Sequence, residues 1–131
     1  RYGDTDLFSS LPAVRSLDRE SLQHIVNLCV SSYAPYYALA AVSNRDGAVI
    51  AIADAEGSRT AHGANDLQHI SIVREPWFVQ ALANTNQVIV YDASSDVLGE
   101  IIDPPSERTI ILARAIKGTS GEPVGVWSSH L

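Results

Sequence analysis

Residues 37–54 read YALAAVSNRDGAVIAIAD, and this stretch decides the fold. Two apolar runs of strand length, 37–43 and 48–54, flank the four residues Asn44-Arg45-Asp46-Gly47. The Asp-Gly pair is typical of a tight hairpin turn, because glycine adopts positive φ without steric cost. Both runs are apolar on both faces, so we expect core packing on one side of them and helices or a ligand cavity on the other.

A second hairpin is predicted near the end of the chain. Its strands are residues 109–116 and 123–129, and residues 117–122 between them are rich in turn formers. A further strand is predicted at residues 87–91, QVIVY. The sequence therefore supplies about five strands, and the hairpins make neighbouring strands antiparallel.

Helices are predicted before each group of strands. Residues 4–15 suit a short helix, and Asp18 is a typical N-cap of a longer one that ends before Pro35. The apolar face of that helix has helical spacing and consists of Leu22, Ile25, Val26, Cys29 and Tyr33. Pro76 suits the first turn of another helix, which ends at residues 84–86.

The order helix, two strands, helix, three strands predicts an α+β, PAS-like fold. We expect a single antiparallel sheet of about five strands, with an N-terminal helix and a crossing helix, in one domain over residues 1–131. Two polar stretches, residues 55–73 and 92–107, interrupt this order, and the first is long enough to form a lid over a site.

Composition excludes several classes of protein. Hydrophobic residues make up 46% and charged residues 18%, which is the balance of an ordinary globular domain. The net charge of −6 would repel a phosphate backbone, so no nucleic-acid partner is expected. The sequence has no apolar run long enough to span a bilayer and no Met, which suggests a piece of a longer protein.

Nothing in the sequence predicts a metal or a cofactor. The single cysteine, Cys29, excludes an internal disulfide and is expected to be a buried, inert thiol. His62 and His69 match no zinc spacing, and His24 and His130 are far from them in sequence.

Five segments in order resemble the Cache family of sensor domains. They are LPAVRSLDRESL (11–22), NRDGAVIA (44–51), REPWFVQALAN (74–84), VIVYD (88–92) and RTIILARAIKGTSGEPVGVWSSHL (108–131). The resemblance implies a non-enzymatic module that binds a small organic ligand on the extracytoplasmic, periplasmic side of a membrane-anchored receptor. It also implies flanking transmembrane helices and an interior kinase, chemotaxis or cyclic-dinucleotide output that this chain does not contain.

The resemblance also indicates where a ligand would bind, and where this sequence departs from the pattern. In amino-acid-binding members an Arg before Pro-Trp holds the ligand carboxylate, whereas this chain has Glu75 there and Arg74 one position earlier. An Asp near the end of the last strand takes the ligand ammonium group, and His130 stands at the matching position here. An α-amino-acid ligand is therefore disfavoured.

Eight residues are candidate ligand contacts, and each has a structural alternative. Aromatic residues would wall the pocket or pack in the core, Glu75 would cap its helix, and the other charged residues would face solvent or make turns. The eight are Trp77, Phe78, Tyr91, Arg74, Glu75, Asp92, Arg114 and His69.

Three other functions compete with ligand sensing. Residues 81–96, ALANTNQVIVYDASSD, also resemble the middle of a cytoplasmic GAF regulatory domain. A small enzyme would have Glu75, Asp92 and Asp96 as acids and His62 or His69 as bases, but no nucleophile elbow, phosphate loop or zinc signature accompanies them. The last alternative is a structural module that pairs receptors as a homodimer through the N-terminal helix.

Overall fold

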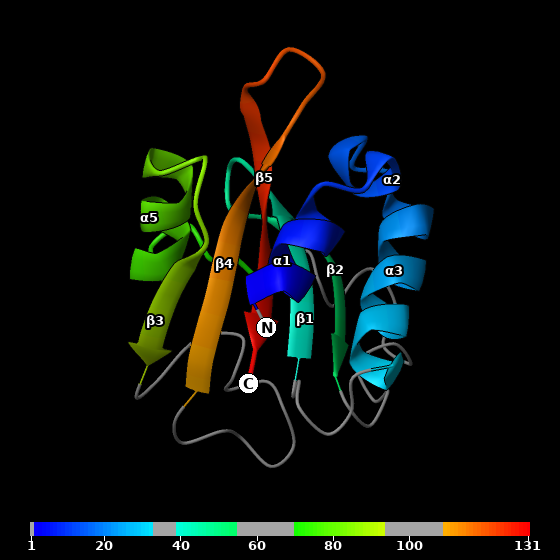
Figure 1. The fold of residues 1–131 in the computed structure, drawn as a ribbon, viewed down its shortest axis with the longest axis horizontal. Coiled ribbons are helices and arrows are strands. Elements are labelled where there is room, and N and C mark those ends of the chain that lie inside the picture. Colours follow the sequence, from blue (N-terminus) through cyan, green and yellow to red (C-terminus); the bar gives the residue numbers. More distant parts are fainter. Residues whose placement is uncertain (1, 33–38, 55–69, 94–108) are drawn as a thin grey trace.

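The five strands form one antiparallel sheet with the order β2-β1-β5-β4-β3 (Figure 1). The computed structural model describes residues 2–32, 39–54, 70–93 and 109–131. The strands are β1 (Leu39–Asn44), β2 (Val49–Asp54), β3 (Ile89–Ala93), β4 (Thr109–Lys117) and β5 (Pro123–His130). The last strand, β5, lies at the centre, because it pairs with β1 on one side and with β4 on the other. The predicted α+β, PAS-like fold is confirmed.

The first hairpin is stabilised by hydrogen bonds between a side chain of its turn and the backbone N–H groups of the same turn. The side chain of Asn44 accepts hydrogen bonds from the N–H groups of Asp46 and Ala48, at 3.0 and 3.1 Å. Gly47 has φ of +90°, which favours glycine, and a Cβ there would lie 2.7 Å from Val73. The predicted Asp-Gly turn is therefore confirmed.

One side of the sheet, which we call the helical face, is covered by α1 (Tyr2–Ser9), α2 (Pro12–Arg15) and α3 (Arg19–Ser32). The helix α3 begins where predicted, because the Asp18 carboxylate accepts hydrogen bonds from the Ser21 hydroxyl and backbone N–H. Its apolar side packs on the sheet, and its buried residues are Leu22, Val26, Cys29 and Val30. Cys29 is buried as expected.

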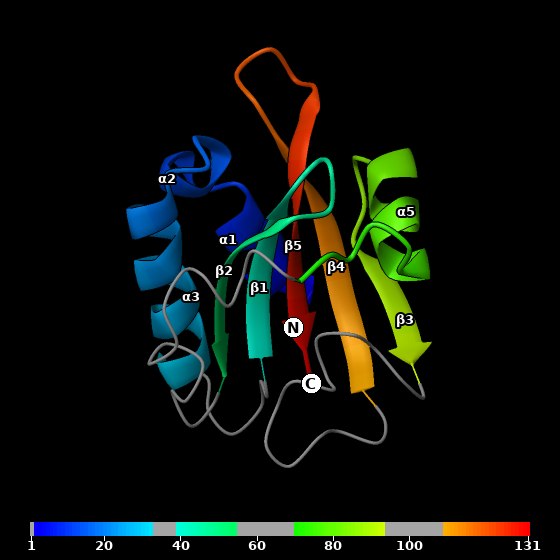
Figure 2. The ribbon, with the colours of Figure 1, turned by 180° about the vertical axis from the view of Figure 1, so that it is seen from behind.

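The opposite side, which we call the α5 face, carries α5 (Pro76–Ala83) (Figure 2). Pro76 is at the first turn of α5, and Trp77, Phe78 and Ala81 are buried, as the sequence predicts. The sheet residues that pack with α5 in this second core are Leu39, Ala41, Val49, Ile52, Ile111, Ala113 and Val126. The sheet therefore has two separate cores.

The structure corrects some predicted boundaries. The short N-terminal helix predicted over 4–15 is two helices, α1 and α2, joined at residues 10–11. The third strand runs from Ile89 to Ala93, two residues later than predicted. Most of the two predicted polar excursions, and Tyr33, lie outside the described residues. Among the residues that are described, no helix is long and apolar enough to cross a membrane.

Candidate ligand site

A buried polar pair lies on the otherwise apolar α5 face at the end of β5. His130 is fully buried, and its Nε2 lies 3.0 Å from the Ser128 hydroxyl oxygen, at hydrogen-bond distance. The edge of the imidazole meets Trp77 of α5, with ring centroids 5.7 Å apart and planes at 88°. The resemblance placed His130 at the position of a ligand-contacting Asp, and β5, which pairs with both of its neighbours, holds His130 in the sheet.

One further hydroxyl group lies on the same face. Ser43 of β1 pairs with Val126 of β5, so its side chain is on the α5 face, and it is buried. Its Oγ has no hydrogen-bond partner among the described residues. Buried polar groups on an apolar face cost free energy unless they are satisfied, so their position here points to a role in binding.

The three aromatic residues predicted for the site come together on the α5 face. Trp77 and Phe78 are buried in the core under α5, and Tyr91 of β3 packs at its edge, half-buried. The candidate site thus combines large aromatic surfaces with a few polar groups, which is the usual make-up of a small-molecule site. Whether they contact a ligand stays a prediction.

Arg74 and Glu75 lie at the entry to α5. Arg74 is exposed, and Glu75 occupies the N-cap position of α5 half-buried, without a side-chain hydrogen bond to the helix. Glu75 therefore does not have the simple capping role that was its structural alternative. Glu75 lies two residues before Trp77 in the sequence and stays a predicted ligand contact.

Two predicted residues do not lie with the others. Tyr91 packs against the α5 face, so Asp92, the next residue of β3, faces the helical side and is exposed. Arg114 of β4 also belongs to the helical side, where it lines a cavity with residues of α1 and α2. We therefore remove Asp92 and Arg114 from the candidate site, because strand alternation places them on the wrong face. His69 lies outside the described residues.

The candidate site is connected to the helical face through β5. Val126, Ser128 and His130 face α5, and the residues between them face the other way. Trp127 stacks on Phe8 of α1, with ring centroids 5.3 Å apart and planes at 7°. One strand therefore contacts both the candidate site and α1.

The described histidines do not come together on one face of the sheet. In the described part of the chain, no three His, Cys, Asp or Glu residues are grouped so that they could hold a metal ion. His24 is exposed on α3, on the helical side, whereas His130 is buried on the other face.

Several solved sensor domains have the same architecture. The sensory domain of the Campylobacter jejuni chemoreceptor Tlp3 matches with a TM-score of 0.69 at 18% identity, covering 99% of this chain and 51% of that chain. The sensor domain of the V. cholerae histidine kinase DctB matches with a TM-score of 0.67 at 14% identity, covering 99% and 46%. The ligand-binding domain of the Pseudomonas fluorescens chemoreceptor CtaA, in complex with L-valine, matches with a TM-score of 0.68 at 14% identity, covering 100% and 51%.

The chain has the fold of a receptor sensor domain. The fold predicted from the resemblance in sequence is thus confirmed, and it is shared with sensory and ligand-binding domains. The chain spans about half the length of each of these sensor domains. No protein-family model matches the sequence, and no curated protein sequence matches it.

Proposed function

We propose that residues 1–131 form one extracytoplasmic, non-enzymatic module that binds a small organic ligand for a membrane-bound signalling receptor. The sensor-domain fold supports this over the GAF alternative, because the matching structures are sensory domains of chemoreceptors and of a histidine kinase. The observation that carries the proposal is the buried His130–Ser128 pair beneath Trp77, a polar group set into an apolar, aromatic face.

The ligand in this proposal lies against the α5 face. Trp77, Phe78 and Tyr91 supply apolar contact, and the imidazole and hydroxyl at the end of β5 supply hydrogen bonds. In this proposal Glu75, at the N-cap position of α5, adds a carboxylate to the site.

The charge of these groups defines the class of ligand. Solved relatives of this fold were crystallised with L-valine or GABA, which carry both an ammonium and a carboxylate group. This chain places Glu75, rather than an arginine, directly before Pro76-Trp77, so a ligand carboxylate would be repelled there. We therefore propose an amine or another hydrogen-bond donor without a carboxylate at that end.

Transmission of binding is proposed to run through β5 to α1. A ligand that contacts His130 or Ser128 presses on a strand whose next residue, Trp127, stacks on Phe8. A shift of β5 by a fraction of an ångström changes this stacking, and α1 responds. The ligand then favours one of two positions of α1, which is a population shift.

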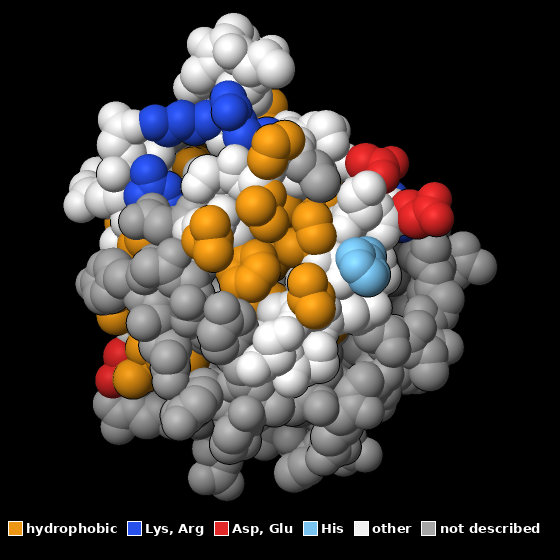
Figure 3. All heavy atoms as spheres, turned by 45° about the vertical axis from the view of Figure 1, so that its right-hand side comes forward, with side chains coloured by type: hydrophobic (Ala, Val, Ile, Leu, Met, Phe, Trp, Pro, Cys, Tyr) orange, Lys and Arg blue, Asp and Glu red, His pale blue; other side chains and the backbone are white. Residues whose placement is uncertain are grey.

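A homodimer through the N-terminal helices would complete such a receptor. Figure 3 shows apolar side chains gathered on the helical side, with Lys and Arg at one edge and acidic residues and a histidine at another. Leu7 of α1 and Leu28 of α3 are 56% and 50% exposed. Two-fold packing would bury them and set opposite charges together. A dimer in sedimentation that Leu28→Glu dissociates supports this, and a monomeric wild-type chain excludes it.

A ligand screen tests the proposed function directly. Amines, purines, short carboxylates and amino acids are added to the purified chain, and the thermal unfolding midpoint is measured. A ligand at 100 times its dissociation constant adds about 2.7 kcal/mol of stability. We expect an amine or purine to give this stabilisation and the amino acids to give none.

Matched variants separate site binding from a general effect. Tyr91→Ala should abolish the stabilisation, whereas Val90→Ala should retain it, because Val90 is the preceding residue of β3 and is 47% exposed on the other side of the sheet. In the variant Trp127→Phe, the fluorescence of Trp77, then the only tryptophan, should change on binding. A hit that stabilises the Tyr91→Ala variant equally, without a Trp77 signal, would show that the ligand binds elsewhere.

A further inference from the structure

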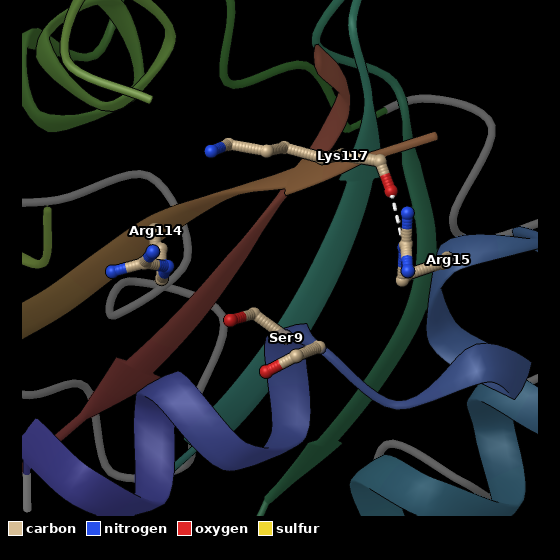
Figure 4. A pocket seen from close by; sticks show the side chains of 5 residues that line it. Ser9, Arg15, Arg114 and Lys117 are labelled. Carbon is tan, nitrogen blue, oxygen red and sulfur yellow. Dashed lines mark hydrogen bonds between the residues drawn. The ribbon is translucent and has the colours of Figure 1, made fainter. Parts of the chain in front are cut away.

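A cavity lies on the helical face, on the opposite side of the sheet from the candidate ligand site. It has a volume of about 230 Å³ and lies between the end of α1, α2 and β4. Figure 4 shows the hydroxyl of Ser9 and the guanidinium of Arg114 facing the same space from α1 and β4. The described residues that line it are Ser9, Ser10, Arg15, Arg114 and Lys117.

The cavity concentrates positive charge in an acidic protein. The chain has a net charge of −6 and nine Lys and Arg residues, and three of these nine line this one cavity. The other described lining residues are serines, which donate hydrogen bonds. Positive charge and hydroxyl donors around a small space form a typical environment for an anion.

Two of the three cations are held by neutral groups. The Arg15 side chain donates from Nε to the Lys117 carbonyl oxygen and from Nη2 to the Gly118 carbonyl oxygen, both at 2.8 Å. The Lys117 ammonium donates to the side-chain amide oxygen of Asn86. Carbonyl and amide oxygens orient these cations but do not neutralise them. In the described part of the chain, neither Arg15 nor Lys117 pairs with a carboxylate.

The third cation, Arg114, is half-buried in the middle of β4 and lies opposite Trp127 of β5. Arg114 has an interaction partner within the protein, and its guanidinium carries five N–H donors, so it can donate to an anion in the cavity as well. Its two neighbours in the strand, Ala113 and Ala115, are buried on the α5 face, and strand alternation therefore commits Arg114 to the cavity side.

We propose that this cavity binds a small, multiply charged oxyanion, such as a phosphate, a sulfate or a short dicarboxylate. The volume is below the roughly 300–1,000 Å³ of sites for drug-sized ligands, which favours a compact ion. Arg15, Arg114 and Lys117 supply the charge, and the serine hydroxyls at the end of α1 complete the shell. The anion bridges α1, α2 and β4, and so fixes α1 on the sheet independently of a ligand on the α5 face.

Isothermal titration calorimetry with phosphate, sulfate and malonate tests the proposal, each at constant ionic strength and against chloride. Each hydrogen bond to a charged group contributes about 1.5–3 kcal/mol, so Arg114→Gln or Lys117→Gln should weaken binding roughly 10- to 100-fold. The control variants Arg19→Gln and Arg45→Gln remove exposed charges outside the cavity and should bind as the wild type does. Lys117→Arg, which keeps the charge, should restore most of the affinity.

The outcomes separate a site from general electrostatics. Binding of any of the three ions that is weakened in the two cavity variants supports the site, and the ion that binds best distinguishes tetrahedral from carboxylate recognition. Equal weakening in the Arg19→Gln control, or no heat beyond that of chloride, overturns the proposal. Circular dichroism of each variant without anion excludes loss of fold as the cause. None of these measurements depends on a ligand at the α5 face.

Discussion

The His130–Ser128 pair allows a sharp test of whether the polar groups of the candidate site act together. The perturbation is His130→Leu, which keeps a side chain of similar bulk under Trp77 but removes the ring nitrogens. The contact in the structure is a 3.0 Å approach of Nε2 to the Ser128 hydroxyl, and the edge-on ring contact with Trp77 is 5.7 Å between centroids.

The expected loss in the free energy of unfolding depends on which contacts the leucine keeps and which polar group loses its partner. An aromatic pair contributes about 0.5–1.5 kcal/mol beyond buried area, and the leucine retains part of this as apolar contact. The Ser128 hydroxyl, 1% exposed, loses its partner, and a buried unsatisfied hydroxyl costs about 1–3 kcal/mol. We expect His130→Leu to lower the free energy of unfolding by about 2 kcal/mol.

The double variant His130→Leu/Ser128→Ala distinguishes this reasoning from a simple loss of bulk. Removing both polar partners leaves no orphaned group, so the double variant should be more stable than His130→Leu alone, within about 1 kcal/mol of the wild type. Urea denaturation of the four proteins measures the coupling energy, which should be about 0.5–3 kcal/mol. His24→Leu, at an exposed position on α3, should change stability by less than about 0.5 kcal/mol.

Additive costs of the two single substitutions would refute the reasoning. Such a result would mean that the imidazole and the hydroxyl contribute separately, and that the short distance between them has no energetic consequence. The candidate site would then rest on its aromatic residues alone.

Two further predictions concern the frame that holds the site. Gly125→Ala would place a methyl group 2.1 Å from the Ser43 carbonyl oxygen, and this backbone atom cannot move away without disturbing the sheet. We therefore expect the free energy of unfolding, measured by urea denaturation, to fall by about 1–3 kcal/mol. Gly118→Ala, whose new methyl meets only side chains, should cost much less. The hydrogen bonds from the Ser21 side chain and backbone lower the pKa of Asp18, so its contribution to the stability of α3 is present above about pH 3.9 and is lost as the pH falls through the lowered pKa. Asp18→Asn should therefore show a smaller loss of stability between pH 5 and pH 2, and an identical pH profile for the two proteins would contradict this.

Local signals in the sequence predicted most elements of the fold. The turn at Asp46-Gly47, the cap at Asp18 and the helix start at Pro76 each depend on residues within a few positions of one another. The strand order β2-β1-β5-β4-β3 has a different origin, because β1 and β5 are far apart in the sequence and pair through backbone hydrogen bonds. The sequence patterns predicted a single antiparallel sheet and its two hairpins, but not the order of the strands within the sheet.

The candidate site was predicted less completely, and strand alternation explains the errors. Side chains alternate between the two faces along a strand, so Asp92 points to the other face of the sheet from Tyr91. For the same reason Arg114 points to the other face from its neighbours Ala113 and Ala115. The prediction grouped these residues by chemistry and did not apply that period. The resemblance indicated His130 as a matching position, but its burial against Trp77 was not predicted, because it is next to the last residue of the chain, where fraying is common. Its signal was present in the alternation of Val126, Ser128 and His130.

The position of β5 also limits which part of the molecule can move on binding. The strand pairs with a neighbour on each side from Gly125 to His130, and β1 approaches it so closely at Gly125 that only glycine fits. A slip of one residue would exchange the two faces of β5 and move Trp127 from the helical face to the α5 face, so the register of β5 is strongly fixed. The helix α1 is held differently, mainly by side-chain packing such as that of Phe8 on Trp127. A signal that starts at His130 is therefore expected to leave the sheet intact and to appear as a displacement of α1, which the fluorescence of Trp127 in a Trp77→Phe variant would report.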